Sequence, residues 1–424
     1  MSANTRSGSA AVSLLAVVAF VGPVCSQQPT RYIITDLGTL GGTFSSAVAA
    51  NNSGVIAGSS TPAGDVVAHA ILWRKGTITD LGTLGGPNSF APEGASPINE
   101  RGAIAGLSAT STVDPYAEVF CDGMGYPIAP YLCRPFLWLR GVMTELPTLG
   151  GNNAAASAIN NRGEVTGVAE TATLDPTCPP PQVFAFEAAL WRPAKGEVQE
   201  LPPLPGDTIS GGNGINDNGQ VAGASGTCAA GAIEAVLWQD VSPIDLGNLG
   251  GVTSNIAFAV NNRGQVVGQS DLLGDATHHA FLWQNGVMTD LGSILGLPVS
   301  LAASVNNQGQ VVGFSQEPDS SNTVAWIWQD GVMTDLNRLI PAELPVFLVD
   351  ALGINDRGQI TGFMLDTLSG ETRGFLATPA ASSDSSAQTP ESNVTKEPPV
   401  LPEKVRKMLE RRMGARLHWT SPPN

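Results

Sequence analysis

The chain has 424 residues and a formal net charge of −16, with 21 Lys and Arg against 37 Asp and Glu. Nucleic-acid binding needs basic groups that contact phosphates, so this charge argues against nucleic acid as a partner. Hydrophobic residues make up 42% of the chain, and it contains 49 Gly and 31 Pro. This composition favours an all-β protein with many turns over a disordered chain.

The first residues, 1–26, predict a secretory signal peptide. Arg6 precedes an apolar run at 10–22 that is too short to span a bilayer comfortably, and cleavage is expected after Ser26. Cys25 raises the alternative of a lipoprotein, but Val24 is bulky where such a site needs a small residue. We therefore expect a secreted protein, either extracellular or periplasmic.

Three short motifs then recur in one fixed order, seven times each, between residues 36 and 377. The first motif is typified by DLGTLGG. The second reads Asn-x-x-Gly-x-(Val/Ile)-x-Gly, and the third is typified by AFLW. The copies of the second motif lie at 51–58, 99–106, 160–167, 216–223, 261–268, 306–313 and 355–362. A period in the forties predicts a repeat architecture.

Each repeat divides into four short apolar segments joined by tight turns, which predicts a small four-stranded antiparallel sheet. In the first segment, every second residue before the motif Asn is mostly Ala or Gly. Small side chains at this period indicate a crowded strand, as expected where the innermost strands of a propeller converge. A solenoid would not need such crowding in every copy.

The two ends of the repeat region predict circular closure. RYIITDLG at 31–38 resembles a fourth strand with no repeat before it, whereas the last repeat stops at GFLATP without a fourth strand. Pairing the two would complete the seventh sheet and remove an exposed edge. We predict an all-β seven-bladed β-propeller of four-stranded antiparallel blades over 27–380, with the ring closed by the N-terminal strand.

Closure predicts one plain face of short turns and one face of variable connections. The longest connections are 107–134 and 168–187, against about ten residues elsewhere, and loops of that length are usually functional or disordered. The four cysteines after residue 26 all lie in connections of this kind and allow three pairings. The simplest pairing is Cys121–Cys133 with Cys178–Cys228. Metal binding is the weaker alternative, because no Cys-x-x-Cys pair is present.

The segments HAFLW at 279–283, NGVMTDLG at 285–292 and INNRGEVTG at 159–167 resemble the HAF-repeat family of exported bacterial proteins. The resemblance covers nearly all of the repeat region. It implies export and a repetitive β domain, and it carries over no catalytic residue because the motif describes the repeat. Some members carry a C-terminal sorting tail with an apolar helix, which this chain lacks.

Most residues capable of chemistry occupy repeated positions, which favours a structural role for them. His69 and His279 hold the same place before a third strand, and six Trp recur in that strand as expected inter-blade core. A ring of acids in the fourth strands is expected to hydrogen-bond to turn amides or Thr hydroxyls rather than to bind cations. These acids are Asp36, Asp80, Glu145, Glu200, Asp245, Asp290 and Asp335. No Ser-His-Asp or Cys-His arrangement is indicated.

Aromatic and acidic residues unique to the longest connection are the better binding candidates, although a merely decorative insertion is the equal alternative. The candidate ligand-binding residues are Tyr116, Phe120, Asp122, Tyr126 and Tyr131, with Asp114 and Glu118 among them.

The C-terminal residues divide into a disordered Ser/Pro linker at 381–401 and a basic tail at 402–424. Val405, Leu409 and Met413 would share one side of an amphipathic helix. Three interpretations stay open: contact with an anionic membrane surface through 402–419, docking on the acidic propeller, or a solvated, frayed end.

These observations predict an exported, monomeric, non-catalytic binding protein that presents its variable loops to a protein, glycan or small ligand. No cofactor and no metal are expected. The alternative is an extracellular lyase or hydrolase with its site at the mouth of the propeller channel, since propellers host many chemistries. Two or more unique titratable residues converging at that mouth would favour the enzyme.

Overall fold

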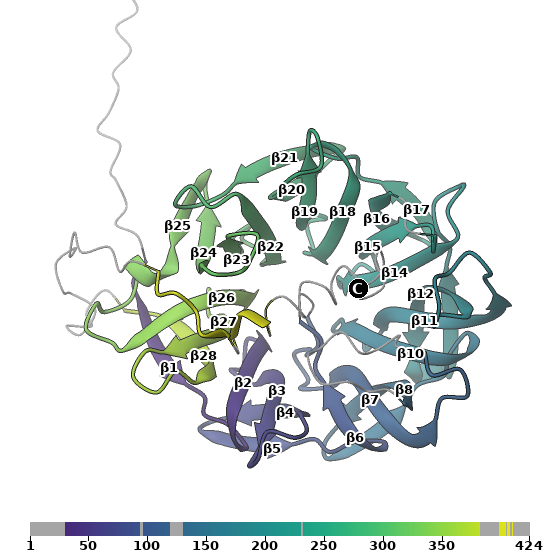
Figure 1. Cartoon of the computed structure of the whole chain (residues 1–424), viewed down its shortest axis with the longest axis horizontal. Helices are drawn as coiled ribbons and strands as arrows, with labels where there is room; N and C mark the ends of the chain where they lie inside the picture. Colours follow the sequence, from purple (N-terminus) through teal and green to yellow (C-terminus); the bar gives the residue numbers. More distant parts are fainter. Residues whose placement is uncertain are drawn as a thin grey trace, which may run out of the picture.

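The computed structural model describes residues 30–93, 96–118, 130–229, 232–381 and 398–409, without 404 and 408. The fold is all-β and propeller-like, and Figure 1 shows its sheets arranged around a common centre. Four strands make up each repeating unit, and successive strands within a unit are antiparallel neighbours. Among the described residues, no helix is long and apolar enough to cross a membrane.

The first three units follow one another along the chain. They contain β2 (Gly41–Ala50), β3 (Ile56–Pro62), β4 (His69–Arg74) and β5 (Thr77–Asp80); β6 (Gly85–Phe90), β7 (Ile104–Val113), β8 (Tyr131–Leu139) and β9 (Val142–Glu145); and β10 (Gly150–Ile159), β11 (Val165–Leu174), β12 (Phe184–Arg192) and β13 (Glu197–Leu201). A short 3-10 helix, η2 (Pro193–Lys195), joins β12 to β13.

The next three units repeat this order. They contain β14 (Ile209–Ile215), β15 (Val221–Gly226), β16 (Ile233–Gln239) and β17 (Ser242–Asp245); β18 (Gly250–Val260), β19 (Val266–Leu272), β20 (His278–Gln284) and β21 (Val287–Gly292); and β22 (Val299–Val305), β23 (Val311–Gln316), β24 (Thr323–Gln329) and β25 (Val332–Asp335). The 3-10 helix η3 (Leu336–Arg338) follows β25.

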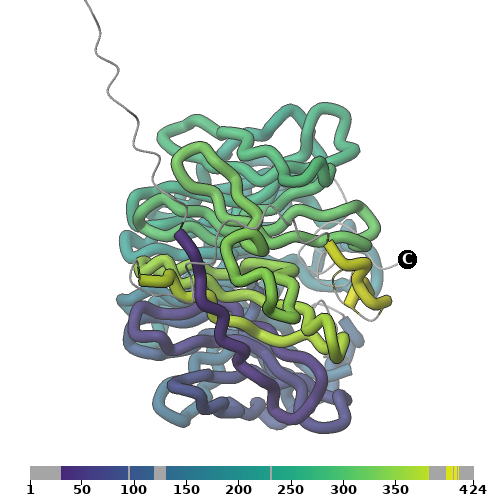
Figure 2. The backbone as a smooth tube through the Cα atoms, turned by 90° about the vertical axis from the view of Figure 1, so that its left-hand side faces the viewer, coloured from purple at the N-terminus to yellow at the C-terminus, as the bar shows by residue number. Residues whose placement is uncertain are grey.

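The remaining unit joins the two ends of the repeat region. It contains β26 (Val346–Ile354), β27 (Ile360–Asp366), β28 (Thr372–Pro379) and β1 (Tyr32–Asp36). β1 pairs antiparallel with β28 over its whole length, from Tyr32 opposite Pro379 to Asp36 opposite Phe375. Figure 2 shows this first strand, in purple, crossing the side of the molecule. Single parallel bridges, β28 to β2 and β16 to β18, merge neighbouring units into eight-stranded sheets.

The Asn-x-x-Gly motif forms the turn between the first two strands of each unit. In the copy at 261–268, the Asn261 side-chain oxygen accepts hydrogen bonds from the amides of Arg263 and Gln265, both at 3.0 Å. Gly264 has a φ of 73°, a left-handed conformation that favours glycine. The last glycine of the motif, Gly268, has no room for a side chain, because a Cβ there would collide with the Ile256 carbonyl oxygen.

The motif also links each unit to the next through two series of hydrogen bonds. In the inner series, each motif Asn side chain donates to the backbone oxygen of the next motif Asn. The order is Asn51, Asn99, Asn160, Asn216, Asn261, Asn306, Asn355 and back to Asn51. In the outer series, the residue directly after each motif Asn donates its backbone amide to the side chain of the equivalent residue in the next unit. Its order is Asn52, Glu100, Asn161, Asp217, Asn262, Asn307, Asp356 and back to Asn52.

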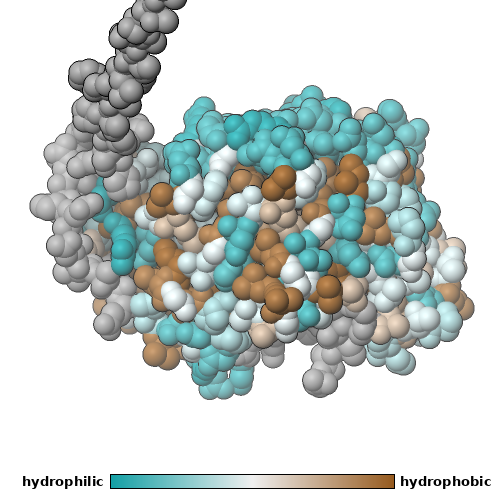
Figure 3. Space-filling model, turned by 90° about the horizontal axis from the view of Figure 1, so that it is seen from above, coloured by the Kyte–Doolittle hydropathy of each residue, from teal (hydrophilic) through white to brown (hydrophobic). Residues whose placement is uncertain are grey.

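The hydrophobic core lies mainly between the units. Trp191 is fully buried among residues of two units, including Ala105 and Leu146 of the preceding one, and its indole N–H donates to Pro147 O at 2.7 Å. Trp238 repeats this bond to Pro202 O at 2.8 Å. The repeated Trp position therefore belongs to inter-blade core, as predicted. Figure 3 views one side of the molecule, where hydrophobic residues gather below a hydrophilic upper margin.

We name the two faces by their connections. The turn face carries the Asn-x-x-Gly turns, and the loop face carries the connections from second to third strands and between units. The two predicted long connections are shorter than expected, because strand pairing continues into them as far as Val113 opposite Tyr131 and Leu174 opposite Phe184. Extended pairing satisfies backbone groups that a free loop would leave to solvent. The connections proper are 114–130 and 175–183.

Candidate functional site

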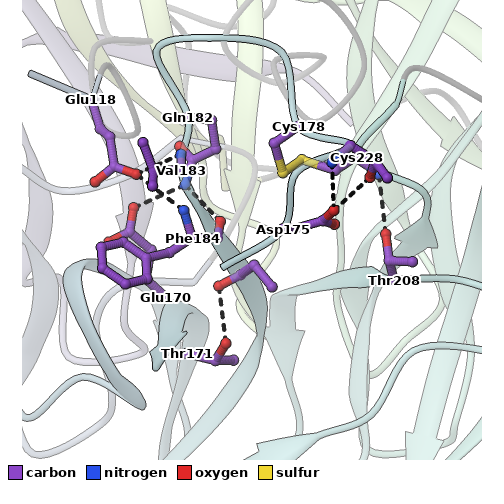
Figure 4. Close-up of a disulfide and its surroundings, with 12 residues drawn as sticks. Glu118, Glu170, Thr171, Asp175, Cys178, Gln182, Val183, Phe184, Thr208 and Cys228 are labelled. Atoms are coloured by element: carbon purple, nitrogen blue, oxygen red, sulfur yellow. Dashed lines mark hydrogen bonds between the residues drawn. A yellow bond between two sulfur atoms is a disulfide. The ribbon is translucent and has the colours of Figure 1, made fainter. Parts of the chain in front are cut away.

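The two long connections of the loop face are bound to each other. One Glu118 carboxylate oxygen accepts hydrogen bonds from the amides of Val183 at 2.8 Å and Phe184 at 3.3 Å, as Figure 4 shows. The Tyr116 ring meets the Phe184 ring edge-on, with centroids 5.5 Å apart. Connections from two neighbouring units therefore form a single surface, which we call the joined loops.

A cluster of buried polar side chains lies beneath the joined loops. The side-chain nitrogen of Asn153 faces oxygens of three carboxyl groups, those of Asp114 at 2.8 Å, Glu118 at 3.3 Å and Glu170 at 3.4 Å. All four residues are buried. Glu170 also accepts from the Gln182 side chain at 3.0 Å and from the Asn153 amide at 2.8 Å. The carboxyl groups thus hold the backbone of the loops in place.

Burial changes the protonation of this cluster. Burial, together with the neighbouring Glu170 charge, raises the pKa of Glu118 to about 7. Burial also raises the pKa of Glu170, opposed by hydrogen bonds from Gln182 and Asn153. Near neutral pH, protonation of one carboxyl group relieves the repulsion between them. Because these groups are buried and already hydrogen-bonded, their arrangement suits positioning of the loops better than contact with a substrate.

The predicted ligand-binding residues fall into three groups. Tyr116 is exposed, with 49% of its surface accessible, and Tyr131 is partly buried at the start of β8. Phe120, Asp122 and Tyr126 lie outside the described residues. Asp114 and Glu118, expected among the binding residues, are instead buried in the cluster.

Sequence reasoning missed the contribution of the second connection. The Phe184 ring meets the Tyr116 ring edge-on, and Glu170 and Asn153 complete the cluster. The only available signal was the unusual length of 168–187, because residues from two repeats meet here without any motif in common.

A disulfide fixes the second connection to the next unit. Cys178 and Cys228 are bonded across 50 residues, which confirms the predicted link between neighbouring blades. The Cys228 amide donates to Thr208 at 3.3 Å, as drawn in Figure 4. Asp175 lies close to both sulfurs, but bonded sulfurs cannot serve as thiolate ligands, so this group does not form a metal site. Cys121 lies outside the described residues, and the Cys121–Cys133 pairing stays a prediction.

A polar pocket of about 150 Å³ lies on the turn face, where the two hydrogen-bond series meet. Residues of the outer series line it, including Glu100, Asp217 and Asp356. Burial tends to raise the pKa of Asp217, but hydrogen bonds from Asn161 and Asn262 outweigh it and hold that pKa below its ordinary value. These carboxylates accept hydrogen bonds from neighbouring amides and therefore link the units.

The repeated His and Asp of the outer strands form hydrogen-bonded pairs within their own units. His69 lies 2.8 Å from Asp80, and His279 lies 3.0 Å from Asp290. In two other units an Arg takes the place of His, giving Arg134–Glu145 at 3.0 Å and Arg373–Asp36 at 2.9 Å. Several of the acids also accept a turn amide, as the sequence predicted; these are Asp36, Asp80, Asp245 and Asp290.

Three units depart from this pattern, because Glu187, Glu234 and Val324 stand at the position of the cation. Glu187 faces Glu200 of its own unit. Burial and the hydrogen bond to Glu200 raise the pKa of Glu187 to about 8. A carboxyl group whose pKa is raised by folding stabilises the protein below its unfolded pKa and loses this contribution as the pH rises through the folded pKa. The pair therefore lowers the free energy of unfolding progressively between pH 4.5 and about 8.

Replacing Glu187 with Gln is expected to remove this pH dependence, because a neutral amide can keep the hydrogen bond to Glu200. At pH 8 the variant should be more stable than the natural chain by about 1 kcal/mol, and at pH 5 the two should be alike. Urea unfolding at both pH values measures this. Glu197→Gln, at an exposed position of the same unit, is the control. An equal gain in stability at the two pH values would contradict the interpretation that ionisation of Glu187 causes the pH dependence.

Comparisons with known proteins give no family. No protein-family model matches the chain, and no curated protein matches it. Solved structures with similar coordinates include an acylaminoacyl peptidase of Pyrococcus horikoshii, with 12% identity, a TM-score of 0.46 and coverage of 78% of this chain and 52% of that one. The chain thus spans about half the length of that peptidase.

Two further solved structures cover most of both chains. An oligogalacturonate lyase from Vibrio parahaemolyticus has 9% identity and a TM-score of 0.43, covering 83% of this chain and 94% of that one. TolB from Acinetobacter baumannii has 11% identity and a TM-score of 0.37, covering 82% and 80%. Likenesses at this level assign no activity to the present chain.

Proposed function

We propose that the protein is an exported seven-bladed β-propeller whose ring is closed by the N-terminal strand. Pairing of β1 with β28 supports this, since it supplies the fourth strand of the last unit. The two hydrogen-bond series support it as well, because both return to the unit in which they start. The Cys178–Cys228 disulfide and the predicted signal peptide support export, since disulfides persist in oxidising compartments.

The function that the joined loops support best is non-catalytic binding of a ligand on the loop face. The observation that carries this proposal is the pairing of the two longest connections through Glu118, Tyr116 and Phe184. This pairing leaves Tyr116, Val113 and Leu174 exposed by 49%, 58% and 59% on two neighbouring units. A fixed surface of aromatic and aliphatic groups suits an apolar side chain of a protein, a sugar ring or an apolar small molecule.

The alternative, an extracellular lyase or hydrolase, draws on the raised pKa of Glu118, which would suit general acid–base catalysis near neutral pH. Against it, Glu118 is only 3% exposed and Glu170 is 0% exposed, so a substrate would not reach them. The binding proposal therefore takes precedence. A Glu118→Gln variant separates the two proposals. If Glu118 only positions the loops, the variant should still bind the ligand. If Glu118 is catalytic, the variant should lose turnover of any substrate found.

Replacing Tyr116 with Ala should weaken ligand binding by at least tenfold, because exposed tyrosines at the centre of a binding surface contribute about 2 kcal/mol. Glycan and protein arrays identify the ligand, and titration calorimetry then measures its dissociation constant. Val287→Ala, which removes an exposed apolar residue from β21, is the matched control and should bind normally. Unchanged affinity of the Tyr116 variant would remove the joined loops as the binding surface.

A further inference from the structure

The C-terminal segment is packed on the body rather than free of it. Its helical residues fall within 403–409, and the Arg406 amide donates to the Pro402 carbonyl at 3.0 Å, as in the first turn of a helix. Leu401, Val405 and Leu409, spaced four residues apart, are 2%, 4% and 3% exposed. Figures 1 and 2 show the segment, in yellow, lying across one face of the molecule beside the last strands.

The receiving surface is a set of buried apolar side chains on the loop face, which we call the docking groove. The apolar side chains that form one buried cluster with the segment come from the connection before β22 and from β24, β26 and β27. They are Leu297, Val324, Phe347, Val349, Leu352, Phe363 and Leu365. The Leu401 amide also donates to the Ser321 carbonyl at 3.2 Å, in the connection between β23 and β24. The segment thus bridges two neighbouring units.

The groove is particular to the last unit. At the third residue after the motif glycine, this unit has Leu365, which is buried against the segment. The other units have polar or small residues there, namely Thr61, Ala109, Glu170, Gly226, Asp271 and Gln316. An apolar residue at the end of β27 has no role in the repeat itself. It would expose a hydrophobic patch if no other part of the protein packed over it.

The C-terminal segment that packs over this surface is joined to β28 by a linker and is not a strand of any sheet. An isolated helix of this length is unstable in water, so the segment is helical because it is docked. A polar stretch, 382–397, separates it from β28, and 16 extended residues reach about 50 Å. In the sequence, Lys404, Arg406 and Lys407 lie between its apolar residues, and the repeat region as a whole is acidic.

We propose that the docking groove is a binding site for amphipathic helices with apolar residues at intervals of four and basic residues between them. The chain's own C-terminal segment occupies this site as a displaceable cap. A partner that presents such a helix would compete with the cap. This inference is independent of the ligand surface on the joined loops, since the groove is formed by other units.

The test uses the full chain and a fluorescent peptide with the sequence of residues 398–424. In the Val405→Asp, Leu409→Asp chain the cap should leave the groove, and fluorescence anisotropy should show at least tenfold tighter peptide binding than to the natural chain. Glu403→Gln, which removes only the acidic member of an exposed ion pair in the same segment, is the matched control and should behave like the natural chain. A peptide carrying the two Asp substitutions should not bind.

We call the Val405→Asp, Leu409→Asp chain the capless variant. Adding Leu365→Thr to it places in the groove the residue that the first unit has at this position. This change should weaken peptide binding at least tenfold. Equal peptide binding by the natural and capless chains, or binding that ignores Leu365→Thr, would overturn the proposal. If circular dichroism shows that the Asp variant is unfolded, Val405→Ala, Leu409→Ala replaces it. The Ala variant must also bind the peptide more tightly than the natural chain does. Equal affinities of the Ala variant and the natural chain would overturn the proposal.

Discussion

Replacing Tyr32 with Ala is expected to lower the free energy of unfolding by about 3–5 kcal/mol, the usual cost of deleting a buried aromatic side chain. Tyr32 is only 2% exposed and packs with Leu336, Leu339 and Phe375. Its amide donates to the Leu339 carbonyl at 2.9 Å, so β1 is attached both to β28 and to the preceding unit. Burial also raises the pKa of Tyr32 to about 12, as expected of a phenol in the core.

Urea unfolding followed by tryptophan fluorescence measures this loss. Ile33→Ala is the matched control, because Ile33 neighbours Tyr32 on the same strand but is 39% exposed, and it should cost less than about 1 kcal/mol. If the Tyr32 variant were as stable as this control, β1 would not belong to the cooperative unit. The proposed closure of the ring would then lose its main support.

Removing the disulfide by Cys178→Ser with Cys228→Ser is expected to cost about 4 kcal/mol. The bond closes a loop of 50 residues, and the entropy of that loop in the unfolded chain sets this magnitude. Because the bond holds the connection that carries Val183 and Phe184, the variant should also bind the loop-face ligand more weakly.

Chemical denaturation of the natural chain, with and without a reducing agent, is the accompanying measurement. The reduced natural chain should lose at least as much stability as the double variant. A double variant that keeps both the stability and the ligand affinity of the natural chain would show that the disulfide positions nothing.

The repeated positions could be predicted because each repeat makes the same contacts. The Asn-x-x-Gly turns, the crowded inner strands, the buried Trp191 and the acids that accept turn amides all follow from motifs present in every unit. The His69–Asp80 pair explains why these two residues recur together. Cys178–Cys228 could be proposed because the predicted closure of the ring would place neighbouring connections on one face.

Apart from the disulfide, contacts between residues that occur in only one repeat could not be predicted from the sequence. Glu118 was expected among the ligand-binding residues, but it accepts hydrogen bonds from amides of the next connection and is buried. The place of the C-terminal segment was left open among lipid, propeller and solvent, and its described residues lie on the propeller. The membrane contact of 402–419 stays a prediction and would require Val405 and Leu409 to leave the groove.

The sequence by itself determined the strand order, the turns and the residues that face the crowded interior, because local periodicity and turn chemistry act within about 45 residues and are repeated seven times. Apart from the disulfide pair, only the tertiary structure decided which unique residues meet. Glu118 with Phe184, and Leu365 with Val405, come together through packing across units, where burial and hydrogen-bond satisfaction depend on distances in space that no spacing along the chain records.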